Sequence, residues 1–318
     1  MKNKLVIILL ICFFNLFLAK NIFANEQFNF KVSEIEILEE GNKIVGSKRG
    51  TISTNDGIVI SANNFIYLKT KNILSANGNV IIEDKTNNYK FYSEKITYEK
   101  NNEIIFTDGD TTSKIYSRYD FISKDTIFLR NEKILKSDNT TKIIDNENQS
   151  LYELGKFSFV IDKEVLKGEK ILVTSNYNLP QNDKLYFENG IFDLKNKSFV
   201  AKDIEVKLKK DIFDNSDNDP RLKGLSAVGK EKITEIEKGV FTSCKKNDDC
   251  PPWSIESELI KHDKIQKTIN YDNAVLKIYD IPVVYFPKFF HPDPTVKRQS
   301  GFLVPHINNS NVLGSSLQ

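Results

Sequence analysis

The chain has 318 residues, with 45 Lys and Arg against 43 Asp and Glu, and with 40% hydrophobic and 28% charged residues. This composition is that of an ordinary soluble chain of one or two domains. It excludes a strongly basic or acidic protein, so the net charge must be judged after any leader segment is set aside.

The first residues resemble a secretion signal. A short basic head, residues 1–4, precedes an apolar run from Leu5 to Ala19 and a small-residue end at Ala24. We predict a cleavable signal peptide over residues 1–24, with an uncleaved anchor as the alternative, although a spanning helix would need roughly 20 apolar residues. Removal of this segment takes three lysines with it and changes the net charge from +2 to −1. Near-neutrality argues against nucleic acid as a partner, because phosphate binding requires a basic excess.

Export also bears on the cysteines. Cys12 lies in the apolar run of the signal, which leaves Cys244 and Cys250 in the mature chain. Disulfides persist outside the cytoplasm, so a local Cys244–Cys250 bridge is one interpretation. Two separate thiols, or pairing elsewhere, are the other.

From residue 56 to about residue 210 the hydrophobic pattern has a period of two, as in Phe157–Phe159 and residues 204–209, and it recurs in Leu276–Ile278. This alternation indicates strands with one buried face. β-branched and aromatic residues dominate these runs. We therefore predict an all-β protein.

Short polar clusters separate the strands, at residues 69–72, 85–88, 100–103, 131–133 and 195–197. Pairs of strands also form a weak internal repeat, in which Gly78 and Gly109, and likewise Phe65 and Ile96, are 31 positions apart. Such repeats indicate an array whose units bury their apolar faces on one another. A parallel β-helix and an antiparallel jelly roll both fit an array. The tight turns favour the jelly roll, because they join only antiparallel neighbours.

One face of this array is predicted to point inward. Its residues are either plain core or, if two sheets splay apart, the lining of an apolar groove for a lipid chain. Composition does not separate the two. The candidates are Phe65, Tyr67, Leu74, Val80, Ile82, Ile96, Tyr98, Ile104, Phe106, Ile127 and Leu129.

Catalytic motifs are not evident. The three histidines, His262, His291 and His306, lie apart and lack metal-ligand spacing. The sequence shows no nucleophile elbow, phosphate loop or dinucleotide fingerprint. The segment 213–230 is predicted to be a polar loop, with a calcium loop as a weaker interpretation. We predict no catalytic residue, no metal and no cofactor, and therefore no enzyme.

The C-terminal hundred residues carry the most specific signals. Phe-Thr-Ser-Cys followed by a tryptophan spans residues 241–253, Pro-Val-x-Tyr-x-Pro spans 282–287, and Lys-Arg-x-Ser-Gly-Phe-Leu-x-Pro spans 297–305. With the upstream repeat, these elements resemble the LptD (OstA/Imp) family of lipopolysaccharide-assembly proteins. The residues that carry the barrel-entry part of the resemblance are Pro282, Tyr285, Pro287, Arg298, Ser300, Gly301, Phe302 and Pro305.

The resemblance implies a periplasmic OstA-type β-jelly roll, V-shaped with two facing antiparallel sheets, over residues 25–295. It implies the first strand of an outer-membrane β-barrel in residues 296–318, too short a segment for a whole barrel. The implied function is lipopolysaccharide transport and assembly, with acyl chains in the apolar groove. The implied partners are lipopolysaccharide, an LptA-like bridge protein added by strand pairing and an LptE-like lipoprotein plug, with localisation at the outer membrane and in the periplasm.

One departure and two alternatives accompany this interpretation. Cys244 matches a family cysteine whose partner lies in the far C-terminal barrel, which this sequence does not contain, so Cys250 is the local substitute. A periplasmic bridge or chaperone module without a barrel shares the repeat but is expected to lack the 282–305 element. A β-helical carbohydrate-active protein or adhesin predicts stacked parallel rungs.

Overall fold

The computed structural model describes residues 28–179, 183–207, 219–244, 252–293, 296, 307–310 and 314–317. In these residues the chain forms strands, two short 3₁₀ turns and no α-helix, which confirms the predicted all-β class. The elements are β1 (Asn29–Leu38), η1 (Glu39–Gly41), β2 (Lys43–Ser53), β3 (Ile58–Ala62), β4 (Asn64–Leu68), β5 (Ile73–Asp84), β6 (Tyr89–Glu99), β7 (Ile104–Ile115), β8 (Tyr119–Lys124), β9 (Ile127–Leu129), β10 (Ile134–Ser137), β11 (Thr141–Asp145), β12 (Ser150–Leu154), β13 (Lys156–Val160), η2 (Ile161–Lys163), β14 (Val165–Ser175), β15 (Asp183–Asp193), β16 (Ser198–Lys207), β17 (Arg221–Lys230), β18 (Ile233–Thr242), β19 (Trp253–Asp263), β20 (Thr268–Ile278), β21 (Ile281–Pro292), β22 (Ile307–Ser310) and β23 (Gly314–Leu317).

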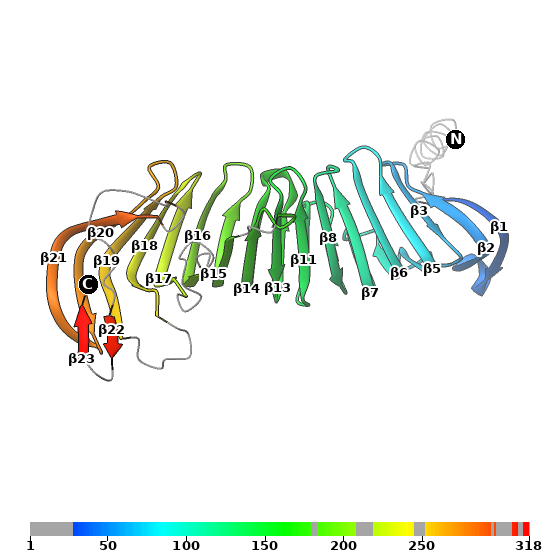
Figure 1. Cartoon of the computed structure of the whole chain (residues 1–318). Coiled ribbons are helices and arrows are strands. Elements are labelled where there is room, and N and C mark those ends of the chain that lie inside the picture. The colour runs from blue at the N-terminus through cyan, green and yellow to red at the C-terminus, as the bar shows by residue number, and fades with distance from the viewer. Residues whose placement is uncertain are drawn as a thin grey trace, which may run out of the picture.

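The strands from β1 to β21 make one hydrogen-bonded sheet of 21 strands. They stand side by side in a long row that begins at β1 and ends at β21 (Figure 1). Every pairing among the described residues is antiparallel, which contradicts the parallel β-helix alternative. In the middle of the row, β7, β8, β11, β12, β14, β13, β10 and β9 pair in sequence to form a closed ring of eight antiparallel strands.

The ring closes because a long strand pairs with two short ones. The first half of β7 pairs with β9 and its second half with β8, and β14 pairs likewise with β13 and β12. The sheet therefore has two halves. We call the half that contains β3, β8, β11 and β12 layer A, and the half that contains β4, β9, β10 and β13 layer B.

A crease separates the two layers halfway along the long strands. Gly78 of β5 and Gly109 of β7 both lie there, with φ of +85°, a backbone conformation that glycine adopts without strain. A side chain at Gly78 would have its Cβ only 2.6 Å from Nδ2 of Asn63, in the link from β3 to β4. The 31-residue spacing of the two glycines thus marks the same bend in successive strands. Left-handed residues also lie in the middle of β2, β14, β16, β18 and β20, at Lys48, Arg49, Lys170, Asp203, Lys238 and Asn273.

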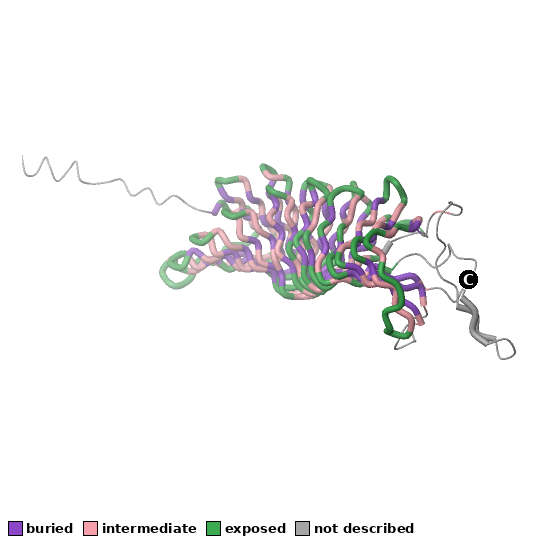
Figure 2. The backbone as a smooth tube through the Cα atoms, turned by 90° about the vertical axis from the view of Figure 1, so that its left-hand side faces the viewer, coloured by how far each residue is buried: buried purple, intermediate pink, exposed green. Residues whose placement is uncertain are grey.

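Aromatic rings from the two layers pack against each other inside the bend. Phe91 in layer A lies 5.1 Å from Phe128 in layer B, measured between ring centroids, and Phe187 lies 5.2 Å from Phe199. Viewed along the row, buried residues alternate with less buried ones along most of the strands (Figure 2), whereas β21 is exposed over most of its length. The two layers therefore enclose a filled, apolar interior.

The prediction of a polar loop over residues 213–230 is wrong for its second part, because residues 221–230 form β17. Small residues occupy inward positions of this strand, which hides its alternation. A Cβ at Gly224 would lie 2.2 Å from Cγ2 of Ile236, and one at Gly229 would lie 2.0 Å from Cε1 of Phe199. Residues 213–218, which carry most of the acidic side chains considered for calcium, lie outside the described residues.

Several predicted segments fall on positions outside the described residues. They include the signal peptide of residues 1–24, and Arg298, Ser300, Gly301, Phe302 and Pro305 of the C-terminal element. β22 and β23 form a separate antiparallel pair. In the described part of the chain, no helix has the length and apolar character needed to cross a membrane.

Candidate functional site

Seven of the predicted inward residues lie on the buried wall of the interior. They come from β4, β5 and β6, and each is at most 7% exposed: Phe65, Tyr67, Leu74, Val80, Ile82, Ile96 and Tyr98. Alternation along the strands places them there, since every second side chain of a strand faces the same side.

The other four, Ile104, Phe106, Ile127 and Leu129, are only half-buried and belong to the opposite face. Their neighbours Ile105 and Phe128 are the buried residues, at 2% and 3% exposure. The register assumed for β7 and β9 was therefore wrong by one residue, which reverses every side chain of a strand. Three apolar residues in a row left the phase of these strands undetermined.

The interior has a mouth opposite the crease, where turns of both layers meet. Asp56, in the turn between β2 and β3 of layer A, reaches two basic residues in turns of layer B. Its Oδ2 lies 2.9 Å from Nη1 of Arg130 and 3.1 Å from Nζ of Lys100. Both basic residues also pair with Glu103 of layer B, and the Tyr98 hydroxyl donates to Glu103 at 2.6 Å. We call these five residues the first clasp.

Hydrogen bonds within the first clasp keep the Asp56 carboxyl ionised. Burial alone would raise the pKa of the Asp56 carboxyl, but hydrogen bonds from Thr54, Arg130 and Lys100 outweigh it and hold that pKa well below its usual value. Burial and the bond to Glu103 raise the pKa of the Tyr98 hydroxyl, which stays protonated and donates.

A second clasp joins the layers further along the row. Arg118, in the turn between β7 and β8 of layer A, donates to both carboxylate oxygens of Asp145 in the same layer at 3.1 and 3.0 Å. Its Nη1 also lies 3.0 Å from Oε2 of Glu164 in layer B, which accepts from the Tyr119 hydroxyl at 2.6 Å. Nη1 of Arg118 also lies 3.1 Å from Oε2 of Glu147, a second acid of layer A. Each clasp thus combines an arginine, at least one acid from the arginine's own layer and one acid from the opposite layer.

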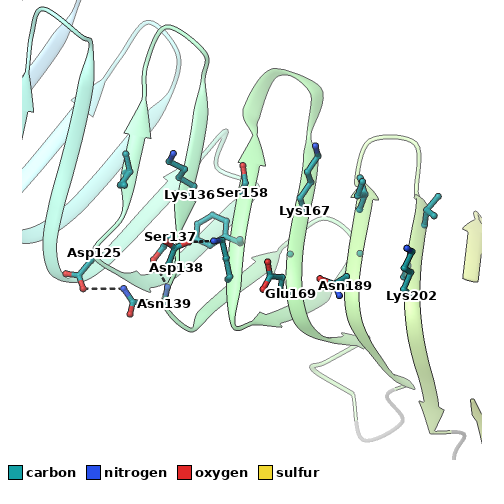
Figure 3. A pocket seen from close by; sticks show the side chains of 18 residues that line it. Asp125, Lys136, Ser137, Asp138, Asn139, Ser158, Lys167, Glu169, Asn189 and Lys202 are labelled. Atoms are coloured by element: carbon teal, nitrogen blue, oxygen red, sulfur yellow. Dashed lines mark hydrogen bonds and ion pairs between the residues drawn. The ribbon is translucent and has the colours of Figure 1, made fainter. Parts of the chain in front are cut away.

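A hollow of about 770 Å³ lies on the outer face, away from the interior. Lys136, Lys167 and Lys202 line it from every second strand, β10, β14 and β16 (Figure 3). Its apolar part includes Ile191 and Val200, which are 47% and 55% exposed. Cationic and apolar groups thus share this outer surface.

The two terminal strands carry exposed apolar side chains. β1 pairs only with β2, and β21 pairs only with β20, so in the described row each has one unpaired backbone edge. Ile37 of β1 is 66% exposed and Tyr285 of β21 is 57% exposed. Pro282 and Pro287 are also exposed on β21. Open backbone edges of this kind accept a further strand.

The cysteine prediction is only partly covered by the described residues. Cys244 is a half-buried free thiol whose Sγ donates to the carbonyl of Trp253 at 3.7 Å. Cys250 lies outside the described residues, so its pairing with Cys244 stays a prediction. Among the residues that the structure describes, no group of three or more His, Cys, Asp or Glu side chains is placed to hold a metal ion.

His291 is buried in the C-terminal part of the interior, and its protonation is expected to cost stability. Its Nδ1 lies 2.7 Å from the Pro292 carbonyl, which only accepts, so Nε2 accepts from the Tyr271 hydroxyl at 2.8 Å and the ring is neutral. Burial lowers the pKa of His291 below the usual 6.5. The unfolded chain then takes up the proton at a higher pH than the folded chain does. The contribution of the neutral ring to the free energy of unfolding is fully present above about pH 6.5. It declines at lower pH, by at most about 1.4 kcal/mol per pH unit.

Urea denaturation between pH 7.5 and 5 measures this dependence. His291→Phe removes the titrating group and is expected to flatten that part of the pH profile, although it leaves the Tyr271 hydroxyl without its partner and lowers stability at every pH. A slope unchanged in the variant would contradict a buried, neutral His291.

Sequence reasoning missed both clasps. Their residues lie far apart in the chain, Asp56 and Arg130 being 74 positions apart, and charged residues are common in every turn. A weak signal was nevertheless present. Arg118 and Arg130 lie in turns, whereas the basic residues of the other turns are mostly lysines, and arginine is the residue suited to partly buried ion pairs.

No family model matches the chain. Partial matches exist to curated proteins named LPS-assembly protein LptD. The protein of Shewanella denitrificans is 28% identical over 161 residues, which cover 48% of this chain and 21% of the relative. That of Sodalis glossinidius is 38% identical over 78 residues, covering 24% of this chain and 10% of the relative. That of Pseudoalteromonas translucida is 36% identical over 96 residues, covering 28% and 12%.

The matched segments amount to about a fifth of the length of these relatives or less. Between a quarter and a half of this chain is involved. The partial matches give family-level support for a relationship between this chain and the LPS-assembly protein LptD.

Proposed function

We propose that this chain acts in lipopolysaccharide transport and assembly at the outer membrane. The partial matches to LPS-assembly protein LptD carry the proposal. The apolar interior supports it, because the acyl chains of an amphiphile gain about 25 cal/mol for each Å² of apolar surface removed from water. A transport role needs no catalytic group.

In this proposal, layers A and B are the two facing sheets of a V-shaped jelly roll, residues 25–295, and the acyl chains enter between them. Aromatic rings fill that space in the structure, for example Phe121 against Phe157 at 5.6 Å. Loading therefore requires the two layers to separate. The crease is the natural hinge, because in the described part of the chain the long strands cross from one layer to the other there.

The unpaired strand edges fit the partners that the proposal requires. An LptA-like bridge protein would add a strand to the free edge of β1, where Ile35 and Ile37 are exposed. β21, at the other end of the row, precedes residues 296–318, which would begin the outer-membrane barrel, with an LptE-like lipoprotein as a further partner. Lipopolysaccharide would then pass along the row from β1 toward β21.

Photocrosslinking tests whether lipopolysaccharide enters the interior. A photoreactive phenylalanine analogue at Phe91, buried at 2% exposure, is expected to capture lipopolysaccharide in cells that make it. The matched control places the same analogue at Val200, on the outer hollow and 55% exposed, where little capture is expected. Capture at Val200 with none at Phe91 would contradict transport through the interior.

A further inference from the structure

In both clasps the arginine pairs with at least one acid from its own layer and with one acid from the opposite layer. Arg130 pairs with Glu103 of its own layer and with Asp56 of the opposite layer. Arg118 pairs with Asp145 and Glu147 of its own layer and with Glu164 of the opposite layer. The own-layer acid fixes the arginine, and the opposite-layer acid ties the two layers together across the mouth.

In the first clasp, the opposite-layer acid, Asp56, is also the acid that water can more easily solvate again. The Asp56 side chain is 44% exposed, whereas that of Glu103 is 18% exposed. Releasing Asp56 costs less than releasing Glu103, because Asp56 keeps more of its contact with water and has less solvation to regain. Asp56 can therefore leave Arg130 while Glu103 keeps the guanidinium in place.

Arg130 also has an unused donor. Its hydrogen bonds to Asp56, Glu103 and Tyr98 all use Nη1. The side chain is 11% exposed. Its Nε is buried and has no hydrogen-bond partner among the described residues. Guanidinium groups bind phosphate through two parallel N–H bonds, so this arginine has a free donor for such an anion.

The charge balance decides how an anion can bind. Asp56 and Glu103 carry two negative charges, and Lys100 and Arg130 carry two positive ones, so the first clasp is neutral. An added anion would meet two carboxylates, and the favourable course is replacement of one of them. The exposed, opposite-layer Asp56 is the one that can be replaced, and its release unties the mouth.

We propose that Arg130 is a binding position for the phosphate group of a phosphorylated amphiphile, which replaces Asp56 as its opposite-layer partner. Head-group binding and opening of the mouth are then one event. The inference rests on the proposed function, because it assumes that the chains of the amphiphile enter the interior. It adds the chemical class of head group and the residue that reads it.

Paired substitutions in the first clasp test this inference, because two of them break the same ion pair with opposite consequences. Asp56→Asn frees Arg130 and is expected to tighten binding of bis-phosphorylated lipid A to the full chain. Arg130→Gln is expected to weaken binding of the same lipid about tenfold, because it removes one charge-assisted hydrogen bond. Lipid A from which both phosphates have been removed is expected to bind Arg130→Gln no more weakly than it binds the unaltered chain.

Three controls complete the experiment. Asp138→Asn breaks an outer ion pair, with Lys156 at 2.8 Å, and is expected to change neither affinity. Arg130→Lys keeps the charge without the planar fork and is expected to recover only part of the phosphate preference. Inorganic phosphate is expected to compete only weakly with phosphorylated lipid A, whereas full competition at equal concentration would indicate a free-phosphate site and overturn the inference.

The outcomes separate this inference from the proposed function. If Asp56→Asn and Arg130→Gln shift the affinity in the same direction for both lipids, the clasp only holds the layers together and the inference is wrong, while the proposed function stands. If the unaltered chain binds neither lipid and the analogue at Phe91 captures no lipopolysaccharide, the proposed function itself is wrong. Thermal melting of each variant verifies that it is folded.

Discussion

Replacing Phe121 by alanine is expected to lower the free energy of unfolding by about 3–5 kcal/mol. Phe121 lies in layer A, is fully buried, and faces Phe157 and Phe159 of layer B with centroid distances of 5.6 and 5.3 Å. Rings from both layers enclose the site, so neither layer can move in to fill the space without disturbing the other. Urea denaturation followed by circular dichroism measures the loss.

The next residue on the same strand is the matched control. Ile122 is 49% exposed and points to the outer face, so Ile122→Ala is expected to change stability by no more than about 0.5 kcal/mol. The two substitutions alter opposite faces of β8. Similar losses for both would contradict a packed interior between the layers.

Replacing Asp145 by alanine is expected to cost a further large amount, about 3–5 kcal/mol, because it removes one partner of a buried ion pair. The Asp145 side chain is completely buried and accepts two hydrogen bonds from Arg118. It also accepts from the backbone amides of Glu147 and Asn148, both at 3.0 Å, in the turn that joins β11 to β12. The substitution therefore loosens the turn and leaves Arg118 with only the exposed Glu147 as an own-layer partner.

Acid titration gives this prediction a second readout. Burial alone would raise the pKa of Asp145, but hydrogen bonds from Arg118 and Asn148 outweigh it and leave that pKa lowered. The stability it contributes is present above its usual pKa of 3.8 and is lost as the pH falls below that value. Asp145→Ala is expected to lack this part of the acid loss. Asp138→Ala, at a side chain that is 81% exposed, is expected to cost no more than about 0.5 kcal/mol, and an equal effect of both would contradict the role given to burial.

The strand pattern and the turns could be predicted from the sequence, because alternation and turn chemistry are local. The four-residue turns at residues 69–72 and 100–103 each end in a left-handed residue, Asn72 and Glu103. The prediction of which β7 side chains point inward was wrong, because three apolar residues follow one another there. The repeat contained the correct answer, since a shift of 31 positions takes Leu74 to Ile105, and both are buried.

Other features could not be predicted because they depend on distant neighbours. β17 has glycine where an inward side chain was expected, and only the proximity of Ile236 to Gly224 explains it. The clasps likewise depend on which turns face each other across the mouth. The pairing of Arg118 with Glu164, 46 positions away, follows from the bend of the whole sheet and from no local pattern.

The crease also determines how this protein can change in length during evolution. Each 31-residue repeat contributes a down-and-up pair of strands, so gaining or losing one whole repeat alters the row by about 10 Å while its cross-section stays the same. Loss of a single strand would instead reverse the direction of every later strand and exchange the turns of layers A and B. Insertions and deletions are thus tolerated in whole repeats, and the distance that such a row spans becomes adjustable in fixed steps.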